Sequence, residues 1–181
     1  MNPREGRLMC RDDRGEIRLA TLRGRDGSET ERLFVIHGGS VVMVPVTRSG
    51  ELILIQNRRP GVGETLWELC AGTLEPDEEP ELGAVRELRE ETGYLAGRME
   101  AIGGFYATPG FSTEYLHVFV ATELSHVGQE LDPTEEITPV AMSHERVRGM
   151  MGGEGQAASE QIRDAKTLAA LALYFARGVR D

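Results

Sequence analysis

One segment, AVRELREETGY at residues 84–94, constrains this chain more than any other. Its spacing predicts a helix that ends at Gly93, because glycine readily takes the left-handed conformation found at helix ends. The helix sets Glu87, Glu90 and Glu91 three and four positions apart, so their carboxylates share one face. Like charges at this spacing repel by about 0.2–0.5 kcal/mol per pair. We therefore expect a positively charged group to neutralise them.

Composition and charge limit the class of protein. With 181 residues, 40% of them hydrophobic, the chain suits one compact domain with a small extension. It has no apolar run of eighteen residues and its start lacks the apolar core of a secretory signal, so we expect a cytoplasmic protein without a membrane segment. The net charge of −10 argues against nucleic acid or anionic lipid as partners. Cys10 and Cys70 are expected to be reduced thiols.

The pattern of short strands and two helices predicts an α+β fold. The β-rich runs RLMCRD, EIRLATLR, RLFVIHGG, SVVMVPVT and ELILIQN, divided by turn signals, indicate antiparallel strands in the first third, and strands resume at MEAIGGFYA, YLHVFVATEL and ITPVAM. A second helix is expected over DAKTLAALALYFARG, with Asp164 as its N-cap, after a loop over 150–160. Without regular βαβ alternation, this order favours an α/β/α sandwich with a mixed sheet.

The carboxylate helix is also amphipathic. Pro80 is placed for its first turn, where a missing backbone N–H costs nothing. Leu82, Val85 and Leu88 form an apolar stripe. We expect this stripe to pack on the core and most of the glutamates to lie elsewhere, in water.

A longer pattern surrounds this helix in GTLEPDEEPELGAVRELREETGY, residues 72–94. Its fixed positions are Gly72, Glu78, Arg86, Glu87, Leu88, Glu90, Glu91, Gly93 and the apolar Tyr94. This segment resembles the Nudix box at each defining position, and nine fixed positions are far more specific than a lone glycine motif. The resemblance covers about residues 40 to 175. It implies a Nudix fold and a metal-dependent hydrolase of nucleoside diphosphates linked to another moiety.

The resemblance implies that the neutralising cation is Mg²⁺ or Mn²⁺, with two or three ions per site. Both are hard cations that prefer carboxylate, carbonyl and water oxygens. By resemblance, Glu87 and Glu91 are the principal ligands and Glu90 is a further ligand. The backbone carbonyl of Ala71, just before the box, is expected to be another.

The other box residues are expected to be structural. Arg86 lies four residues before Glu90, so it can pair with a carboxylate and orient the cluster. Gly72 and Gly93 are expected to allow backbone turns, and Glu78 completes the box.

A general base is needed to take the proton of the attacking water. Relatives in this family take it either from the box, here Glu90 or Glu91, or from a later loop. That loop would be DPTEEI, which offers Glu135 and Glu136 just before the strand ITPVAM. We favour Glu135 and keep Glu136 and the box glutamates as alternatives.

The signal for the substrate lies outside the box. Pro109 is sixteen residues beyond Gly93, and FYATPGFSTE resembles the proline-containing segment of ADP-ribose pyrophosphatases. QNRRPGVGETLWELCAG resembles their QYR…ELPAG segment, and IRDAKTLAAL resembles their last helix. Asn57 departs from this pattern by replacing an aromatic residue, and Cys70 departs from it by replacing a proline. The first departure bears on adenine stacking.

Candidate substrate-binding residues follow from the same segments. A guanidinium fork matches phosphate oxygens, so Arg58 and Arg59 are candidates for holding a phosphate. Pro109, Gly110 and Glu114 of the proline loop are expected to contact or orient the substrate.

The N-terminal strands are expected to form an antiparallel extension over 1–40, before a Nudix hydrolase domain over 41–181. By resemblance this extension is exchanged between two subunits, which implies a homodimer. Arg25 or Arg32 of one subunit would then reach the substrate of the other.

The expected reaction is hydrolysis of ADP-ribose, or a related ADP-sugar, to AMP and a sugar phosphate. An alternative keeps the chemistry and changes the nucleotide to GDP-mannose, flavin adenine dinucleotide or NADH. A second alternative is a Nudix sensor that binds a nucleotide without cleaving it. The intact box and the lack of a second domain argue against the sensor.

Overall fold

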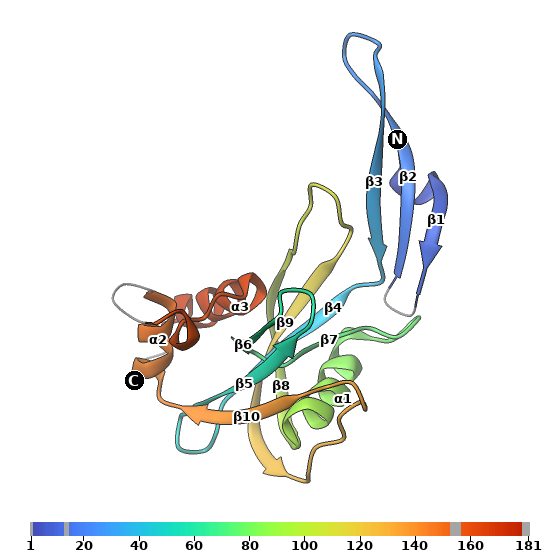
Figure 1. Cartoon of the computed structure of the whole chain (residues 1–181). Helices are drawn as coiled ribbons and strands as arrows, with labels where there is room; N and C mark the ends of the chain where they lie inside the picture. Colours follow the sequence, from blue (N-terminus) through green and yellow to red (C-terminus); the bar gives the residue numbers. More distant parts are fainter. Residues whose placement is uncertain (1, 13–14, 153–156, 179–181) are drawn as a thin grey trace.

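The computed structural model describes residues 2–12, 15–152 and 157–178, drawn in Figure 1. The strands are β1 (Arg7–Arg11), β2 (Gly15–Arg23), β3 (Glu29–His37), β4 (Ser40–Pro45), β5 (Leu52–Arg59), β6 (Glu64–Glu68), β7 (Ala71–Thr73), β8 (Tyr94–Tyr106), β9 (Tyr115–His126) and β10 (Ile137–Met142). The α-helices are α1 (Pro80–Thr92), α2 (His144–Gly152) and α3 (Ala165–Ala176). Two short 3-10 helices are η1 (Pro3–Glu5) and η2 (Ala158–Glu160).

The body has two sheets between helices. One sheet has the order β7-β4-β9-β8 and is mixed, because β4 runs parallel to β9. The other has the order β10-β5-β6 and is antiparallel. Alternate residues of β4 enter two cores: Val41 lies in the cluster that contains Leu88 of α1, and Val42 in the cluster that contains Leu171 of α3. This arrangement confirms the α+β sandwich, with the expected mixed sheet as one of two.

Helix α1 has the ends predicted from the sequence but a different buried face. It begins at Pro80, and Gly93 takes the left-handed conformation with φ 75° just beyond its end. Leu82 of the predicted stripe is 64% exposed, so that part of the prediction is wrong. The buried face instead runs through Leu88 and the carboxylate of Glu91. The helix therefore packs an ionisable group where apolar periodicity predicted none.

The C-terminal helix α3 covers the opposite face of the body. The Asp164 side chain accepts a hydrogen bond from the Thr167 backbone N–H, which confirms Asp164 as the N-cap. The loop expected over 150–160 is shorter than predicted, because α2 continues to Gly152 and η2 follows. Residues 153–156 of that loop lie outside the described residues.

The three N-terminal strands form a separate antiparallel sheet that projects from the body (Figure 1). Strand β3 touches the body where the Val35 N–H donates to the Phe111 carbonyl at 2.8 Å and the Thr113 N–H donates to the Val35 carbonyl at 3.0 Å. Cys10 on this sheet and Cys70 in the body are both free thiols, as predicted. No helix in the described part of the chain is long and apolar enough to cross a bilayer.

Candidate active site

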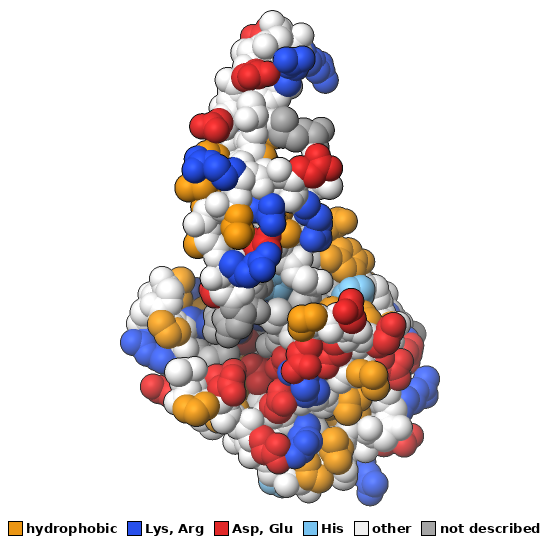
Figure 2. Space-filling view, turned by 90° about the vertical axis from the view of Figure 1, so that its right-hand side faces the viewer, with side chains coloured by type: hydrophobic (Ala, Val, Ile, Leu, Met, Phe, Trp, Pro, Cys, Tyr) orange, Lys and Arg blue, Asp and Glu red, His pale blue; other side chains and the backbone are white. Residues whose placement is uncertain are grey.

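A polar cavity of about 390 Å³ lies beside α1, β7, the end of β5 and the loop between β9 and β10. Seven carboxylates line it against two guanidinium groups, which gives it a strong excess of negative charge. The carboxylates are those of Glu75, Glu87, Glu90, Glu91, Glu130, Asp132 and Glu135, and the guanidinium groups are those of Arg59 and Arg86. Figure 2 shows acidic side chains gathered on the body at the foot of the projecting sheet.

Gly72 is required by the close approach of Glu87. A Cβ atom at position 72 would lie 1.8 Å from the carboxyl carbon of Glu87, so any larger residue would displace that carboxylate. Gly72 does not have a positive φ, whereas Gly93 does. A backbone turn was predicted at both glycines. The structure supports the turn at Gly93 and gives Gly72 a different reason, namely space for a carboxylate beside the backbone.

Glu91 is the most deeply buried carboxylate of this cavity, with 4% of its surface exposed. Its Oε2 accepts a hydrogen bond of 2.8 Å from the backbone N–H of Ala71. Burial raises the pKa of Glu91 to about 8; the Ala71 hydrogen bond opposes this rise, and the charges of Glu87 and Glu135 add to it. Burial likewise raises the pKa of Glu87, although the Arg86 side chain opposes that rise. The fold therefore holds two carboxylates in surroundings that disfavour their ionised forms.

Arg86 joins the box residues together. Its Nε and Nη2 donate to the two carboxylate oxygens of Glu78, each at 2.9 Å. Its Nη1 donates to Glu87 at 2.7 Å and to Glu90 at 3.1 Å, and its Nη2 also donates to the Thr73 carbonyl at 3.2 Å. The hydrogen bonds to Glu78 are the first cause of the raised pKa of Arg86. One guanidinium thus fixes the positions of both the helix carboxylates and the chain before the helix.

The loop between β9 and β10 closes one side of the cavity. Its Glu130 N–H donates to the Glu90 carbonyl at 3.1 Å, and its Gln129 side chain donates to the Glu91 carbonyl at 2.7 Å. Glu135 lines the cavity, and its side chain accepts from the Asp132 N–H at 3.0 Å. The lining residues do not include Glu136. Of the two candidates in this loop, the structure therefore brings Glu135 to the carboxylates of the box.

The two candidate arginines of β5 separate. Arg59 lines the cavity, whereas Arg58 is exposed and does not line it. Neighbouring residues of a strand point to opposite faces, which explains the difference.

The proline loop lies outside this cavity, because neither Pro109 nor Gly110 lines it. Glu114 does not line it either, and its side chain accepts a hydrogen bond of 2.8 Å from the Ser40 hydroxyl.

Divalent cations fit the chemistry of this cavity. Carboxylate and carbonyl oxygens are the ligands that Mg²⁺ and Mn²⁺ prefer. Among the described residues, no three histidine, cysteine or acidic groups are already arranged around one point as metal ligands. Arg86 Nη1 donates hydrogen bonds to both Glu87 and Glu90, so its positive charge partly neutralises these two carboxylates. The excess of carboxylates along this cavity suits a group that brings more positive charge.

Several residues that line the cavity were not predicted from the sequence. Glu75, Glu130 and Asp132 line the cavity together with the predicted residues. The acidic runs EPDEEPE and QELDPTEE contain them, so density of charge was a signal, but nothing in the sequence shows that both runs face the same helix.

Comparisons with known proteins place the chain among named relatives. The chain is 38% identical over 148 residues to an ADP-ribose pyrophosphatase of Bacillus subtilis (strain 168), covering 81% of this chain and 77% of that protein. It is 36% identical over 138 residues to an ADP-ribose pyrophosphatase of Mycobacterium tuberculosis (strain ATCC 25618 / H37Rv), covering 72% and 67%. A crystal structure described as an ADP compounds hydrolase superposes with a TM-score of 0.79 at 20% identity, covering 94% of this chain and 89% of that one, which shows a shared fold.

The family comparison covers the whole site. The family model described as NUDIX domain matches residues 37–168, which include the box, the β5 arginines and the loop before β10. This match spans most of the chain and agrees with the resemblance seen in the sequence. The chain therefore belongs to the NUDIX domain family.

Proposed function

We propose that this NUDIX enzyme hydrolyses the pyrophosphate bond of ADP-ribose, or of a related ADP-sugar, to AMP and a sugar phosphate with Mg²⁺ or Mn²⁺. The observation that carries the proposal is the carboxylate-lined cavity built on the complete box, with the buried Glu91 at its base. The similarity to proteins named ADP-ribose pyrophosphatase supports the substrate class.

The residues that would hold the cations are Glu87, Glu90, Glu91 and the backbone carbonyl of Ala71. Bound divalent cations neutralise pyrophosphate charge and lower the pKa of a coordinated water. Arg86 keeps the box carboxylates in position through the hydrogen bonds described above. The acidic residues that line this site would hold cations, and the cations would attract the substrate. A protein of net charge −10 could in this way accept an anionic substrate.

The proton of the attacking water requires an acceptor near the cavity. Glu135 has the position for this role, because it lines the cavity while Glu136 does not. Its carboxylate would take the proton as the water oxygen bonds to phosphorus and the bridging P–O bond breaks. Arg59, the other guanidinium of the cavity, would pair with a phosphate oxygen.

We also propose a cytoplasmic homodimer that pairs through the projecting N-terminal sheet. Exposed apolar side chains on this sheet support the proposal: Leu8, Met9, Ile17 and Leu33 are each more than a third exposed. Small isolated sheets gain stability when another surface covers their apolar residues. Sedimentation of the full chain tests this, with a dimer as the expected result. A monomer at micromolar concentration would contradict the dimer.

A substrate panel tests the reaction. The protein is incubated with Mg²⁺ and, separately, with ADP-ribose, GDP-mannose, diadenosine polyphosphates, NADH and flavin adenine dinucleotide, and the products are separated by chromatography. We expect AMP to be released fastest from ADP-ribose. Faster cleavage of another compound would overturn the substrate assignment but would still support metal-dependent hydrolysis of a pyrophosphate bond. Binding without cleavage of any compound would favour the sensor.

A further inference from the structure

Arg59 belongs to a cluster of ion pairs around a buried carboxylate, that of Glu68. Glu68, the last residue of β6, is 1% exposed. Arg59 donates to both of its carboxylate oxygens, from Nε at 2.8 Å and from Nη2 at 2.6 Å. This bidentate pairing fixes the plane of the guanidinium and is among the strongest side-chain interactions in proteins. Because Nε and Nη2 face Glu68, the Nη1 edge is left for other partners.

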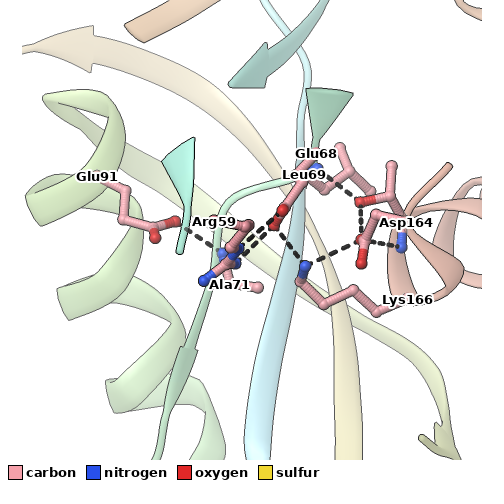
Figure 3. Close-up of polar contacts among 8 residues, drawn as sticks. Arg59, Glu68, Leu69, Ala71, Glu91, Asp164 and Lys166 are labelled. Carbon is pink, nitrogen blue, oxygen red and sulfur yellow. Dashed lines mark hydrogen bonds and ion pairs between the residues drawn. The ribbon is translucent and has the colours of Figure 1, made fainter. Parts of the chain in front are cut away.

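The first turn of α3 supplies a second cation to the same carboxylate. Lys166 donates to Glu68 and also to Asp164, the latter at 2.9 Å. The next residue, Thr167, accepts from the Leu69 N–H at 2.9 Å through its hydroxyl oxygen. Figure 3 shows Arg59 and Ala71 between Glu91 on α1 and this first turn of α3. The C-terminal helix is thus fastened to the strand end that precedes Ala71.

The charges of this cluster leave Arg59 able to bind an anion. The single negative charge of Glu68 is shared between Arg59 and Lys166, while Asp164 also compensates Lys166. The Arg59 side chain keeps 37% of its surface exposed and lines the cavity, whereas Lys166 does not line it. Burying such a cluster rarely adds net stability, because desolvation costs about as much as the attraction returns. A role in positioning explains its presence better than stability does.

We propose that Glu68, shared with Lys166, is a positioning residue that holds Arg59 with its free edge toward the cavity to bind a phosphate of the substrate. This inference rests on the proposed function, because the phosphate belongs to the nucleotide substrate. It extends the site to residues from β6 and α3 that do not touch the cavity themselves.

The sign of a KM change separates positioning from simple electrostatics. Glu68→Gln removes a negative charge beside the cavity, which by charge alone would attract an anionic substrate and lower KM. Loss of the bidentate pairing would misplace Arg59 and raise KM. We expect KM for ADP-ribose to rise about tenfold, since a misplacement of the order of 1 Å is costly for a positioned group. An unchanged or lower KM overturns the proposal, even if the melting temperature falls.

A second arm tests whether Glu68 acts through Arg59. In an Arg59→Met background, Glu68→Gln is expected to change KM no further, because the effects of coupled residues are not additive. An equal tenfold rise in both backgrounds would contradict the proposal. If the Glu68→Gln variant does not fold, Lys166→Met provides the same test. We expect Lys166→Met to raise KM for ADP-ribose roughly threefold and Lys166→Arg, which keeps the positive charge, to leave KM unchanged. The matched control is Arg163→Met, which removes a surface partner of Glu64 near the same helix and should leave KM unchanged.

A binding readout separates this inference from the proposed function. Calorimetry with Mg²⁺ and an ADP-ribose analogue in which a methylene group replaces the bridging pyrophosphate oxygen measures affinity without turnover. We expect weaker binding by about tenfold for Glu68→Gln than for the unaltered protein, in line with a lost charged hydrogen bond. Equal affinity of the two proteins would overturn the positioning role. A protein that binds ADP-ribose but cleaves no member of the panel would overturn the proposed function alone, with the affinity difference still supporting the role of Glu68.

Discussion

Two buried glutamates on either side of Arg59 have opposite surroundings. Glu68 is 1% exposed and pairs with two cations, Arg59 and Lys166. Glu91 is 4% exposed, and no lysine or arginine pairs with it among the described residues; its carboxylate accepts from the Ala71 N–H. The same side chain at nearly the same burial is thus neutralised on one side and left charged or protonated on the other. The difference indicates that the chain itself supplies positive partners for Glu68, whereas the partner of Glu91 would come from a bound ligand.

This contrast follows from which elements surround each residue. The start of α3 carries Lys166 to the Glu68 side, whereas α1 and the loop before β10 bring Glu87 and Glu135 to the Glu91 side. Burying an unpaired carboxylate is unfavourable, so a fold that buries Glu91 in a cavity lined by further carboxylates suits a cationic ligand. The proposed divalent cations would supply that charge.

The largest expected effect is on turnover by Glu91→Gln. The amide keeps the shape of the side chain and can still accept from the Ala71 N–H, but it removes the charge that a cation needs. We expect kcat to fall by roughly 10³-fold or more with the fold intact, measured as AMP release from ADP-ribose with Mg²⁺. Glu81→Gln, on an exposed position of the same helix, is the control. An unchanged kcat would refute the metal role of Glu91.

The next effect concerns the space that Gly72 leaves for Glu87. Gly72→Ala places a methyl group where the Glu87 carboxylate lies, so the carboxylate must move. We expect activity to fall by about 10²-fold, as for a displaced catalytic group. Gly61→Ala is the matched control, because a Cβ there meets nothing within 4 Å. Equal activities of the two variants would show that the position of Glu87 does not matter for the reaction.

The two glutamates should also respond with opposite signs in stability. Glu68→Gln removes a carboxylate that pairs with both Arg59 and Lys166, so it is expected to lower the melting temperature of the metal-free protein. Glu91→Gln removes a carboxylate that is unfavourable when ionised, so it is expected to raise the melting temperature at pH 8. Scanning calorimetry in EDTA measures the melting temperatures of both variants. Shifts of the same sign would contradict the difference between a paired Glu68 and an unpaired Glu91.

The pH dependence of the metal-free protein gives a smaller effect. The pKa of Glu91 is about 8 in the folded protein against an ordinary value of 4.5, because burial disfavours its charged form. Between these values the folded state holds a proton that the unfolded state has released, so this group makes stability fall as pH rises from 4.5 to 8. Glu91→Gln should flatten that decline in melting scans. An identical slope in variant and parent would contradict the shift.

Local signals in the sequence predicted the ends of elements and the acidic centre of the site. Pro80, Gly93 and Asp164 set helix ends through their own backbone or side-chain chemistry, so neighbouring residues sufficed to identify them. The spacing of Glu87, Glu90 and Glu91 places them on one helix face in any fold that contains the helix.

The remaining features depend on contacts between distant parts of the chain. The Lys166 to Glu68 pair joins residues 98 positions apart, and no local pattern links them. The choice of Arg59 over Arg58 depends on strand register, which a run of two arginines does not reveal. Leu82 was expected to be buried and is exposed, whereas the carboxylate of Glu91 is buried. The packing of α1 against the rest of the body decides both, and it is not a local property of the helix sequence.

The most direct test of metal-dependent hydrolysis is to titrate Mg²⁺ into the metal-free protein with ADP-ribose present and to follow AMP release. We expect no release in EDTA and a rate that rises to saturation with Mg²⁺ for the unaltered protein, with almost none for Glu91→Gln at any Mg²⁺ concentration. AMP release at full rate in EDTA would contradict the claim that the carboxylate cavity works by holding divalent cations.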